Sequence, residues 1–355
     1  MRIGTGASDR RTFLKQVTAA AGGFALAGST AELMAQMAPE WKNKIGIELY
    51  TVRNLLTPEA YESVLAKLAG MGYKEVEPAD PYNRMEPAQY KALLDKYGLK
   101  MYSTHADATE GPELEKELEG QALMGIKYTA VRAPRRGGPG ASPGRGPGAP
   151  GGPAGTGQQG RGPGAGGPGA GGPAAGGPRP QTQRPPQSVE SVKRSCERMN
   201  KYGAVLQKFG MKYYIHNHAT EFELLDDGRT TQYDVFLKET DAALVALQLD
   251  IGWAYMAGQD VLDMFKKNPG RYELWHVKDA KYKQADPTLT PNARARASQI
   301  VTMAEGDIDY KTVFANAKLA GLKHFVIEQD TAGQGGRDAL EDCKIACQNL
   351  YKILS

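Results

Sequence analysis

The sequence predicts a single-domain (β/α)8 TIM barrel, and three observations support that prediction. Short apolar runs alternate eight times with longer amphipathic runs. Several amphipathic runs end in a glycine just before the next apolar run, which is the usual way for a helix to end. Outside two segments of unusual composition about 265 residues remain, close to the roughly 250 typical of this fold. Eight repeats favour closure of a parallel sheet into a barrel over an open sheet.

The apolar runs are predicted to be strands and the amphipathic runs helices, because their lengths and periods differ in that sense. The predicted strands span residues 44–50, 73–77, 100–105, 127–132, 212–218, 247–250, 274–279 and 324–328. The predicted helices span residues 58–69, 87–97, 112–124, 189–209, 233–239, 261–267, 310–319 and 337–353.

The first segment of unusual composition covers residues 1–36. Arg10 and Arg11 precede a Phe-Leu-Lys triplet, an apolar run over residues 17–27 and then small residues. This order resembles a twin-arginine export signal, with an amphipathic N-terminal helix as the alternative. The apolar run is short and rich in Ala and Gly, so we expect no stable membrane span. The barrel, residues 37–355, is therefore expected to be exported by the twin-arginine machinery to the periplasm or beyond.

The second segment covers residues 134–187 and is dominated by Gly, Pro, Ala and Arg. It has no apolar period, so it cannot bury enough surface to offset the entropy lost on ordering. We predict a disordered Gly/Pro-rich insert after strand 4, in a loop that tolerates insertions. A passive spacer is favoured over a contact between its arginines and an anionic surface.

The net charge of +4 is unevenly distributed along the chain. Residues 1–36 carry +2 and residues 134–187 carry +6, which leaves −4 on the rest of the barrel. An acidic body argues against a nucleic-acid surface. The absence of a Walker-type or Rossmann glycine fingerprint in the sequence argues against a nucleotide site. The sequence leaves the oligomeric state open.

Polar residues gather at the carboxyl ends of the predicted strands, which form the catalytic face of a barrel. Four of the five histidines lie there: His105, His216, His218 and His276. Asp250, His276 and Glu328 end three successive strands, which a closed barrel brings to one rim. Carboxylates crowded together repel one another unless a cation separates them. Carboxylate and imidazole ligands suit one divalent metal ion, such as Mn²⁺, Mg²⁺, Co²⁺ or Zn²⁺.

Six segments together resemble the xylose isomerase-like barrel family, which includes sugar phosphate isomerases and epimerases, ketose 3-epimerases and inosose dehydratases. The segments are IGIELYTVR at 45–53, GYKEVE at 72–77, HNHATEF at 216–222, LDIGW at 249–253, HVKD at 276–279 and GDID at 306–309. The resemblance implies one metal ion held by Glu, Asp, His and Glu on strands five to eight. Asp250, His276 and Glu328 match the last three ligands. The first ligand departs from the pattern, and we predict His216 there with Glu221 as its rival.

The resemblance also implies an isomerase or epimerase that removes a proton next to the carbonyl of a sugar or keto sugar. Ketose epimerases use two metal-bound carboxylates as bases, and His216 replaces one of them. A dehydratase or lyase acting on an inosose or a 3-keto glycoside is therefore the alternative. Because the chain is expected to be exported, we expect a carbohydrate substrate without a phosphate.

Individual roles follow from these expectations. Glu328 is the predicted base, and His105 or His218 is the predicted acid. Lys278 is predicted either to hold a substrate oxyanion or to form a salt bridge with a neighbouring carboxylate. The predicted substrate-binding residues are Glu77, Glu221 and Trp253, with core packing as the alternative for the aromatic side chain.

Two other functions compete with this interpretation. A phosphodiesterase of the endonuclease IV branch would need more histidines for a multi-metal cluster and a basic face. A non-catalytic sugar-binding barrel would need a metal triad that does no chemistry.

Overall fold

The computed structural model describes residues 40–78, 85–108, 110–131, 186–282, 286 and 288–355. The predicted export signal, residues 1–36, lies outside the described residues. The predicted Gly/Pro-rich insert lies outside them as well, except for residues 186–187. Both assignments therefore stay predictions. Among the helices of the described part, none is long and apolar enough to cross a membrane.

Eight parallel strands form a nearly closed barrel, which confirms the predicted fold. They pair in the order β2-β1-β10-β7-β6-β5-β4-β3, and a bridge between Glu75 and Lys100 links the two ends of this order. β1 and β10 approach closely because of Gly46, where a Cβ would lie 2.8 Å from the Phe325 carbonyl oxygen. The strands are β1 Gly46–Glu48, β2 Glu75–Glu77, β3 Ser103–Ala106, β4 Tyr128–Val131, β5 Lys212–His216, β6 Val245–Asp250, β7 Leu274–Val277 and β10 His324–Ile327.

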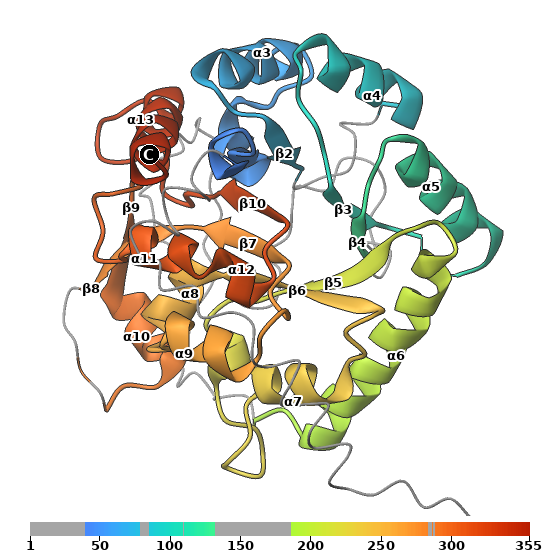
Figure 1. Cartoon of the computed structure of the whole chain (residues 1–355), viewed down its shortest axis with the longest axis vertical. Helices are drawn as coiled ribbons and strands as arrows, with labels where there is room; N and C mark the ends of the chain where they lie inside the picture. The colour runs from blue at the N-terminus through green and yellow to red at the C-terminus, as the bar shows by residue number, and fades with distance from the viewer. Residues whose placement is uncertain (1–39, 79–84, 109, 132–185, 283–285, 287) are drawn as a thin grey trace, which may run out of the picture.

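Helices surround the strands on the outside, as Figure 1 shows. Each predicted helix is present, and the stretch predicted as 310–319 is split into α11 and α12. Gly72 ends α3 with a φ of 111° and donates to the carbonyls of Ala69 and Leu68, as predicted for a helix-ending glycine. The helices are α3 Tyr61–Met71, α4 Pro87–Lys96, α5 Gly111–Leu123, α6 Val189–Gln207, α7 Gln232–Glu239, α9 Val261–Lys267, α11 Tyr310–Ala315, α12 Ala317–Ala320 and α13 Ala339–Ile353.

Several short elements near the carboxyl ends of the strands were not predicted. Most of the strands are shorter than predicted; β5, for example, ends at His216 and β7 ends at Val277. Asp279 instead begins an antiparallel hairpin, because its carboxylate accepts hydrogen bonds from the backbone N–H groups of Ala304 and Gly306. The short elements are η1 Leu49–Leu55, η3 Thr220–Phe222, α8 Ile251–Met256, β8 Asp279–Tyr282, α10 Pro291–Ala297 and β9 Ser298–Val301.

The strand register determines which side chains fill the barrel lumen, because alternate residues of a strand point to opposite faces. A lumen cavity is lined by Glu75 and His324 from one end and by Glu77, Ser103 and Gln248 from the other. We call the carboxyl end the upper lumen; it holds Glu48, Glu77, His216, Gln248, Asp250, His276, Lys278 and Glu328. We call the amino end the lower lumen; it holds Glu75, Tyr102, Tyr128, Lys212, Glu273 and His324.

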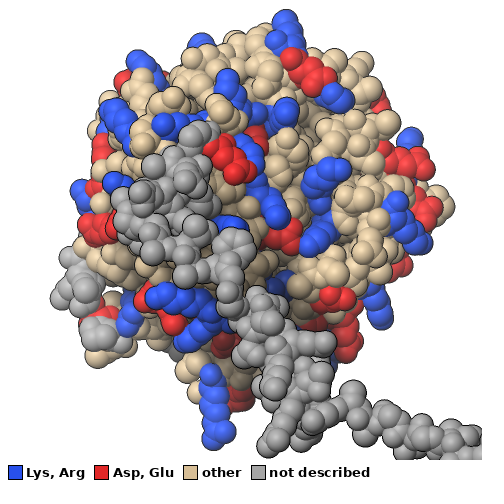
Figure 2. All heavy atoms as spheres, in the orientation of Figure 1, with Lys and Arg blue, Asp and Glu red and all other residues tan. Residues whose placement is uncertain are grey.

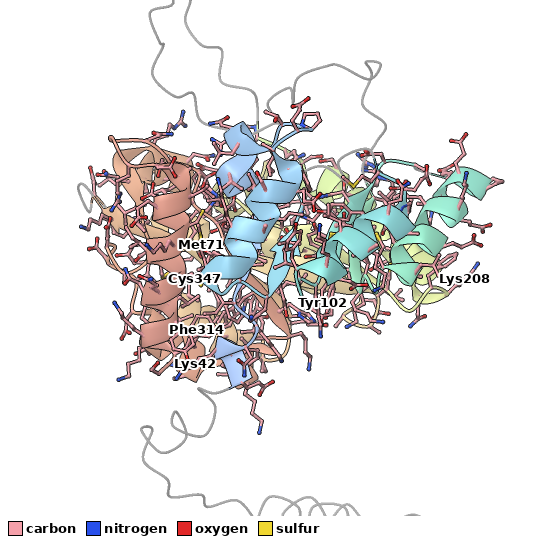
Figure 3. The ribbon with its side chains drawn as sticks, turned by 90° about the horizontal axis from the view of Figure 1, so that it is seen from above. Lys42, Met71, Tyr102, Lys208, Phe314 and Cys347 are labelled. Atoms are coloured by element: carbon pink, nitrogen blue, oxygen red, sulfur yellow. The ribbon has the colours of Figure 1, made fainter. Side chains whose placement is uncertain are left out.

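Two views locate these ends and the charges around them. Figure 3 shows the barrel from the side, with Tyr102 of the lower lumen toward the same edge as Lys42, which precedes β1. Basic and acidic side chains are interspersed over the face drawn in Figure 2. On that face the described residues form a surface of mixed charge.

Candidate metal centre

Four ionisable side chains meet in the upper lumen, from neighbouring strands of the barrel. His216 ends β5, Asp250 ends β6, His276 lies in β7 and Glu328 follows β10. One potential ligand atom from each residue lies within 4.8 Å of those of the other three. The register brings them together, since Asp250 pairs with His276, which pairs with Val326, two residues before Glu328. The group contains each of the four residues predicted as metal ligands.

Glu221, the rival for the fourth ligand position, has a different partner. It lies in the 3-10 turn η3, and its Oε2 accepts a hydrogen bond of 2.6 Å from the backbone N–H of His218. It is not a member of the ligand groups found among the described residues. The same contact turns the chain just after β5, which explains why this strand ends at His216. Of the two rivals, His216 is therefore the one that lies in the candidate ligand group.

His276 lies between two carboxylates. Its Nδ1 is 2.7 Å from Glu328 Oε2, and its Nε2 is 3.0 Å from Glu77 Oε1. Burial alone would lower the pKa of His276, but these two carboxylates outweigh it and raise the pKa well above its ordinary value. Burial opposes ionisation of Glu77, yet His276 and Ser103 hold its pKa at about 2. Without a metal ion, the two carboxylates therefore favour the protonated form of His276.

Lys278 is a fully buried cation beside the ligands. Its Nζ lies 2.6 Å from Asp330 Oδ2, 3.1 Å from Asp250 Oδ2 and 3.2 Å from Glu328 Oε2. Burial disfavours its charge, but Asp250 and the other carboxylates raise the pKa of Lys278 well above its ordinary value. Gly252 makes room for it, because a Cβ there would lie 2.7 Å from Lys278 Cβ. The geometry supports the salt bridge over the contact with a substrate oxyanion.

Asp250 has one carboxylate oxygen engaged and one available. Oδ1 caps α8 by accepting a 2.8 Å hydrogen bond from the N–H of Trp253. Oδ2 is buried and accepts no hydrogen bond, although Lys278 lies 3.1 Å away. Burial raises the pKa of Asp250, and the ammonium of Lys278 opposes that rise. A buried carboxylate oxygen that accepts no hydrogen bond still has lone pairs for a cation, so this atom fits a metal ion beside the ammonium of Lys278.

The side chains that support the two imidazoles were missed in the sequence. Gln248 Oε1 lies 3.1 Å from His216 Nδ1, and Gln248 Nε2 donates a 2.7 Å hydrogen bond to Glu77 Oε2. Ser103 donates its hydroxyl proton to the same oxygen of Glu77. Burial, aided by the charge of His276, lowers the pKa of His216 well below its ordinary value. Gln248 could have been suspected because it lies two residues before Asp250, on the same face of β6.

Glu77, which was predicted to contact substrate, ends β2 in the upper lumen. It is only 3% exposed, and its carboxylate contacts Ser103, Gln248 and His276. These contacts place Glu77 beside the candidate ligands, and its contact with substrate stays a prediction.

Glu48 joins Glu77 and His276 in a second group of close ligand-type atoms. Its Oε2 is buried and accepts no hydrogen bond. Burial and the charge of Glu77 raise the pKa of Glu48 well above its ordinary value, which favours the protonated form of this carboxyl. Because Glu77 already contacts His276 Nε2, the group around His216 is the better metal site.

The predicted acids and the predicted aromatic contact lie around this centre. His218 is exposed, and its ring centroid is 4.9 Å from that of His216 and 5.6 Å from that of Trp253. His105 is half-buried on β3, where its Nε2 lies 3.2 Å from the Tyr214 hydroxyl. Trp253 is 7% exposed, with Lys278 Nζ 5.0 Å from its ring centroid. Of these side chains, His218 has the most open access to a ligand.

Two imidazoles and two carboxylates converging in a buried site fit one divalent ion. In known metal sites a carboxylate or carbonyl oxygen accepts the second ring N–H of a histidine ligand and orients it, and here the Glu77 carboxylate and the Gln248 amide oxygen lie in such positions. No thiolate is offered, since the three cysteines are buried elsewhere in the described helices. The donor set therefore fits a metal ion of borderline hardness.

Comparison with known proteins gives a family match. The profile described as Xylose isomerase-like TIM barrel matches residues 168–346. The chain is also 30% identical, over 129 residues, to an inosose dehydratase from Clostridium perfringens strain 13. That match covers 35% of this chain and 42% of the relative, so the similarity spans less than half of the curated relative.

Two solved structures share the fold. One is a sugar phosphate isomerase/epimerase from Parabacteroides distasonis, with 19% identity, a TM-score of 0.57 and coverage of 87% of this chain and 94% of that chain. The other is a xylose isomerase-like TIM barrel protein from Mycobacterium smegmatis in complex with magnesium. It has 14% identity, a TM-score of 0.51 and coverage of 88% of this chain and 96% of that chain. At these identities the likeness concerns the fold alone.

Proposed function

The chain belongs to the xylose isomerase-like TIM barrel family, and we propose that it removes a proton from the carbon next to the carbonyl of a keto sugar or cyclic keto polyol. One observation carries this proposal. The donor atoms of His216, Asp250, His276 and Glu328 converge at the carboxyl ends of the strands, where barrel enzymes keep their catalytic sites. A non-catalytic sugar-binding barrel would have no use for such a buried group of metal-ligand side chains.

We infer that these four residues hold one divalent ion. Two imidazole nitrogens and two carboxylate oxygens suit Zn²⁺, Co²⁺ or Mn²⁺. Mg²⁺ also stays a candidate, since the Mycobacterium smegmatis relative is in complex with magnesium. When bound, the ion supplies a Lewis acid that polarises the substrate carbonyl and makes the neighbouring C–H bond more acidic.

Glu328 is the base in this proposal. Burial opposes its ionisation, but Lys278 and His276 outweigh burial and hold the pKa of Glu328 well below its ordinary range. The carboxylate is therefore ready to accept a proton at neutral pH. Lys278, 3.2 Å from Glu328 Oε2, also keeps the side chain in place beside the ligands.

His218 is the proposed acid. It is the exposed imidazole next to the ligand His216, and Trp253 supports its ring from the side. In the proposed elimination, Glu328 takes the proton from the carbon next to the carbonyl. The electrons of that C–H bond form a C=C bond, and the hydroxyl on the adjacent carbon leaves with the proton of His218 as water. Positioned proton transfer of this kind contributes roughly 10²–10⁴-fold to a rate.

Elimination is favoured over epimerisation by the identity of the strand-five residue. Epimerisation by two bases needs a second carboxylate, and this chain has His216 in that place. The curated relatives of similar sequence are named inosose dehydratase, which is an elimination. Isomerisation or epimerisation is the second candidate, because His105 on β3 approaches the centre from a different direction than Glu328 and could return a proton.

The proposed substrate carries no phosphate. This part of the proposal rests on the predicted export of the chain by the twin-arginine machinery to the periplasm or beyond. It is also supported by Lys278, whose ammonium is already shared among three carboxylate oxygens and is a poor partner for an anionic group.

The test is an incubation of the metal-loaded protein in D₂O with a panel of inososes, ketoses and 3-keto glycosides, followed by NMR and mass spectrometry. We expect deuterium at the carbon next to the carbonyl and a product that has lost one molecule of water. Glu328→Gln should abolish both, and Glu115→Gln, an exposed carboxylate on α5, should preserve both.

The variant His218→Asn separates the two halves of the reaction. It should slow the loss of water by roughly 10²-fold while deuterium exchange and metal binding persist. If the metal-loaded wild type exchanges no deuterium with any member of the panel, and Asp250→Ala binds metal as the wild type does, the proposed function is wrong.

A further inference from the structure

A single carboxylate of the upper lumen is connected to both imidazoles of the candidate metal centre. Glu77 Oε1 lies 3.0 Å from Nε2 of His276. Its other oxygen accepts a 2.7 Å hydrogen bond from the amide of Gln248, whose own oxygen lies 3.1 Å from Nδ1 of His216. Glu77, Gln248 and the two imidazoles therefore form one continuous chain of hydrogen bonds, which we call the Glu77 relay.

The direction of each hydrogen bond in the Glu77 relay is determined by the groups present. Glu77 Oε2 accepts from both the Ser103 hydroxyl and the Gln248 amide nitrogen, so this carboxylate is the acceptor in each of these contacts. Gln248 must therefore present its NH₂ group to Glu77 and its oxygen to His216. That oxygen can only accept, so His216 must carry its proton on Nδ1.

The same reasoning applies to His276, with the opposite nitrogen. Nε2 must donate to Glu77, so only Nδ1 can release a proton and present a lone pair. Nδ1 is also the atom beside Glu328 and 3.9 Å from Asp250 Oδ2. The nitrogens that face away from the Glu77 relay are therefore Nε2 of His216, which has a free lone pair, and Nδ1 of His276, which presents one once its proton is released.

We propose that Glu77 and Gln248 are positioning residues that fix the tautomers of both imidazoles and so preform a site with two nitrogen and two oxygen ligands. This inference rests on the proposed metal, and it gives His216 a specific role. A neutral imidazole in place of a carboxylate is a useful ligand only when its proton is held on the far nitrogen. Gln248, two residues before the ligand Asp250, holds it there.

Glu77→Gln should reverse the hydrogen bonds from residue 77 through Gln248 to His216 and keep the one with His276. An amide at position 77 that accepts from His276 must present its NH₂ to Gln248. Gln248 would then turn its oxygen toward residue 77 and its NH₂ toward His216, because two NH₂ groups cannot bond one another. His216 would have to accept at Nδ1 and carry its proton on Nε2, which removes its lone pair from the centre while His276 keeps its own.

The first measurement reads the tautomers without any metal. Two-dimensional ¹⁵N–¹H NMR of the metal-free protein distinguishes a protonated Nδ1 from a protonated Nε2 in each histidine. We expect His216 to be the Nδ1–H tautomer in the wild type and the Nε2–H tautomer in Glu77→Gln. An Nε2–H tautomer of His216 in the wild type would overturn the Glu77 relay.

The second measurement uses Co²⁺ as the probe and its visible absorption as the readout. Gln248→Leu should weaken Co²⁺ binding by about 10–100-fold and change the ligand-field bands, because His216 is no longer held. Ser103→Ala is the matched control: it removes one donor to Glu77 but leaves both imidazole contacts, so its effect should stay below about threefold.

The two measurements separate this inference from the proposed function. Normal tautomers in a wild type that binds no Co²⁺ would overturn the metal site and, with it, the positioning role. Tight Co²⁺ binding that Gln248→Leu and Glu77→Gln leave unchanged would retain the metal site and overturn the Glu77 relay. Circular dichroism and thermal unfolding of each variant identify any loss that comes from misfolding.

Discussion

The two ends of the barrel lumen both bury charged side chains, but they balance those charges differently. In the lower lumen each acid has its own base: Glu75 lies 3.1 Å from His324, and Glu273 lies 2.5 Å from Lys212. The described upper lumen instead holds Glu48, Glu77, Asp250 and Glu328 around Lys278 and two imidazoles. In the lower lumen the buried charges are paired one to one. In the upper lumen carboxylates outnumber the cationic side chains, so a further cation would balance them.

The histidines show the same contrast at the level of one residue type. His324 begins β10 in the lower lumen, where it stacks on Tyr102 with ring centroids 3.8 Å apart. His276 lies in the neighbouring strand β7, between two carboxylates of the upper lumen. A strand-end histidine is therefore informative only when the end at which it lies is known.

The largest expected effect comes from replacing His276 in the upper lumen, with the same replacement of His324 in the lower lumen as the control. His276→Ala should weaken binding of Zn²⁺ or Co²⁺ by at least about 100-fold, because it removes a ligand and leaves Glu77 and Glu328 unpaired. His324→Ala should leave the metal Kd unchanged. Isothermal titration calorimetry of both variants checks this, and equal losses at the two ends would contradict the contrast.

The next effect is the number of protons that the protein releases when the metal ion binds. In the metal-free protein the pKa of His276 is raised above its ordinary value, so its Nδ1 carries a proton that the metal must displace. We expect release of about one proton per ion near neutral pH, and an affinity that rises about tenfold per pH unit until the pH passes the pKa of His276. Calorimetry in buffers of different ionisation enthalpy measures the proton count.

His216 should add nothing to that count, since its lowered pKa keeps it neutral. A count near two, or an affinity that is independent of pH between 6 and 8, would contradict the assigned charge states.

A smaller effect, on the pH dependence of stability, is expected from the buried carboxyl of Glu48. Burial and Glu77 raise its folded pKa, so its contribution to stability is complete below its unfolded pKa and is lost as the pH rises through the folded pKa. Glu48→Gln cannot ionise, so its metal-free form should gain stability relative to the wild type as the pH rises, by an amount of order 1 kcal/mol. Urea unfolding at several pH values checks this. A difference in unfolding free energy that stays constant across the pH range would show that folding does not change the pKa of Glu48.

The smallest effect is expected in the lower lumen. Lys212→Met breaks the contact with Glu273, but the lysine side chain is 31% exposed, so the loss should be within about 1 kcal/mol. The metal Kd should not change. A loss of metal binding in this variant would mean that the two ends of the lumen are coupled, contrary to the comparison drawn above.

The sequence was sufficient to predict the eight strands and the four convergent side chains. The reason is physical: in a closed parallel barrel, residues at the carboxyl ends of neighbouring strands must meet, so Asp250, His276 and Glu328 were predictable from their positions alone. His216 followed from the same rule, with a resemblance to a known family marking it as a departure.

Other parts of the site could not be predicted because they depend on contacts across the lumen. Nothing in the sequence near Glu77 indicates that Gln248, 171 positions later, donates to it. Nor could the hairpin that starts at Asp279 be predicted, because it depends on backbone N–H groups 25 and 27 residues further along. The roles of Lys278 and Trp253 were open for the same reason, since Lys278 was found to pair with three carboxylates and to cover the Trp253 ring.

The central claim is one metal ion held by two imidazoles and two carboxylates. Crystals grown with Zn²⁺ and measured on both sides of the zinc absorption edge test it most directly. We predict a single anomalous peak in the upper lumen, about 2.0–2.1 Å from Nε2 of His216 and Nδ1 of His276, with oxygens of Asp250 and Glu328 completing the site. A peak bound by Glu221 with His216 turned away, or no peak among these four residues, would contradict the account.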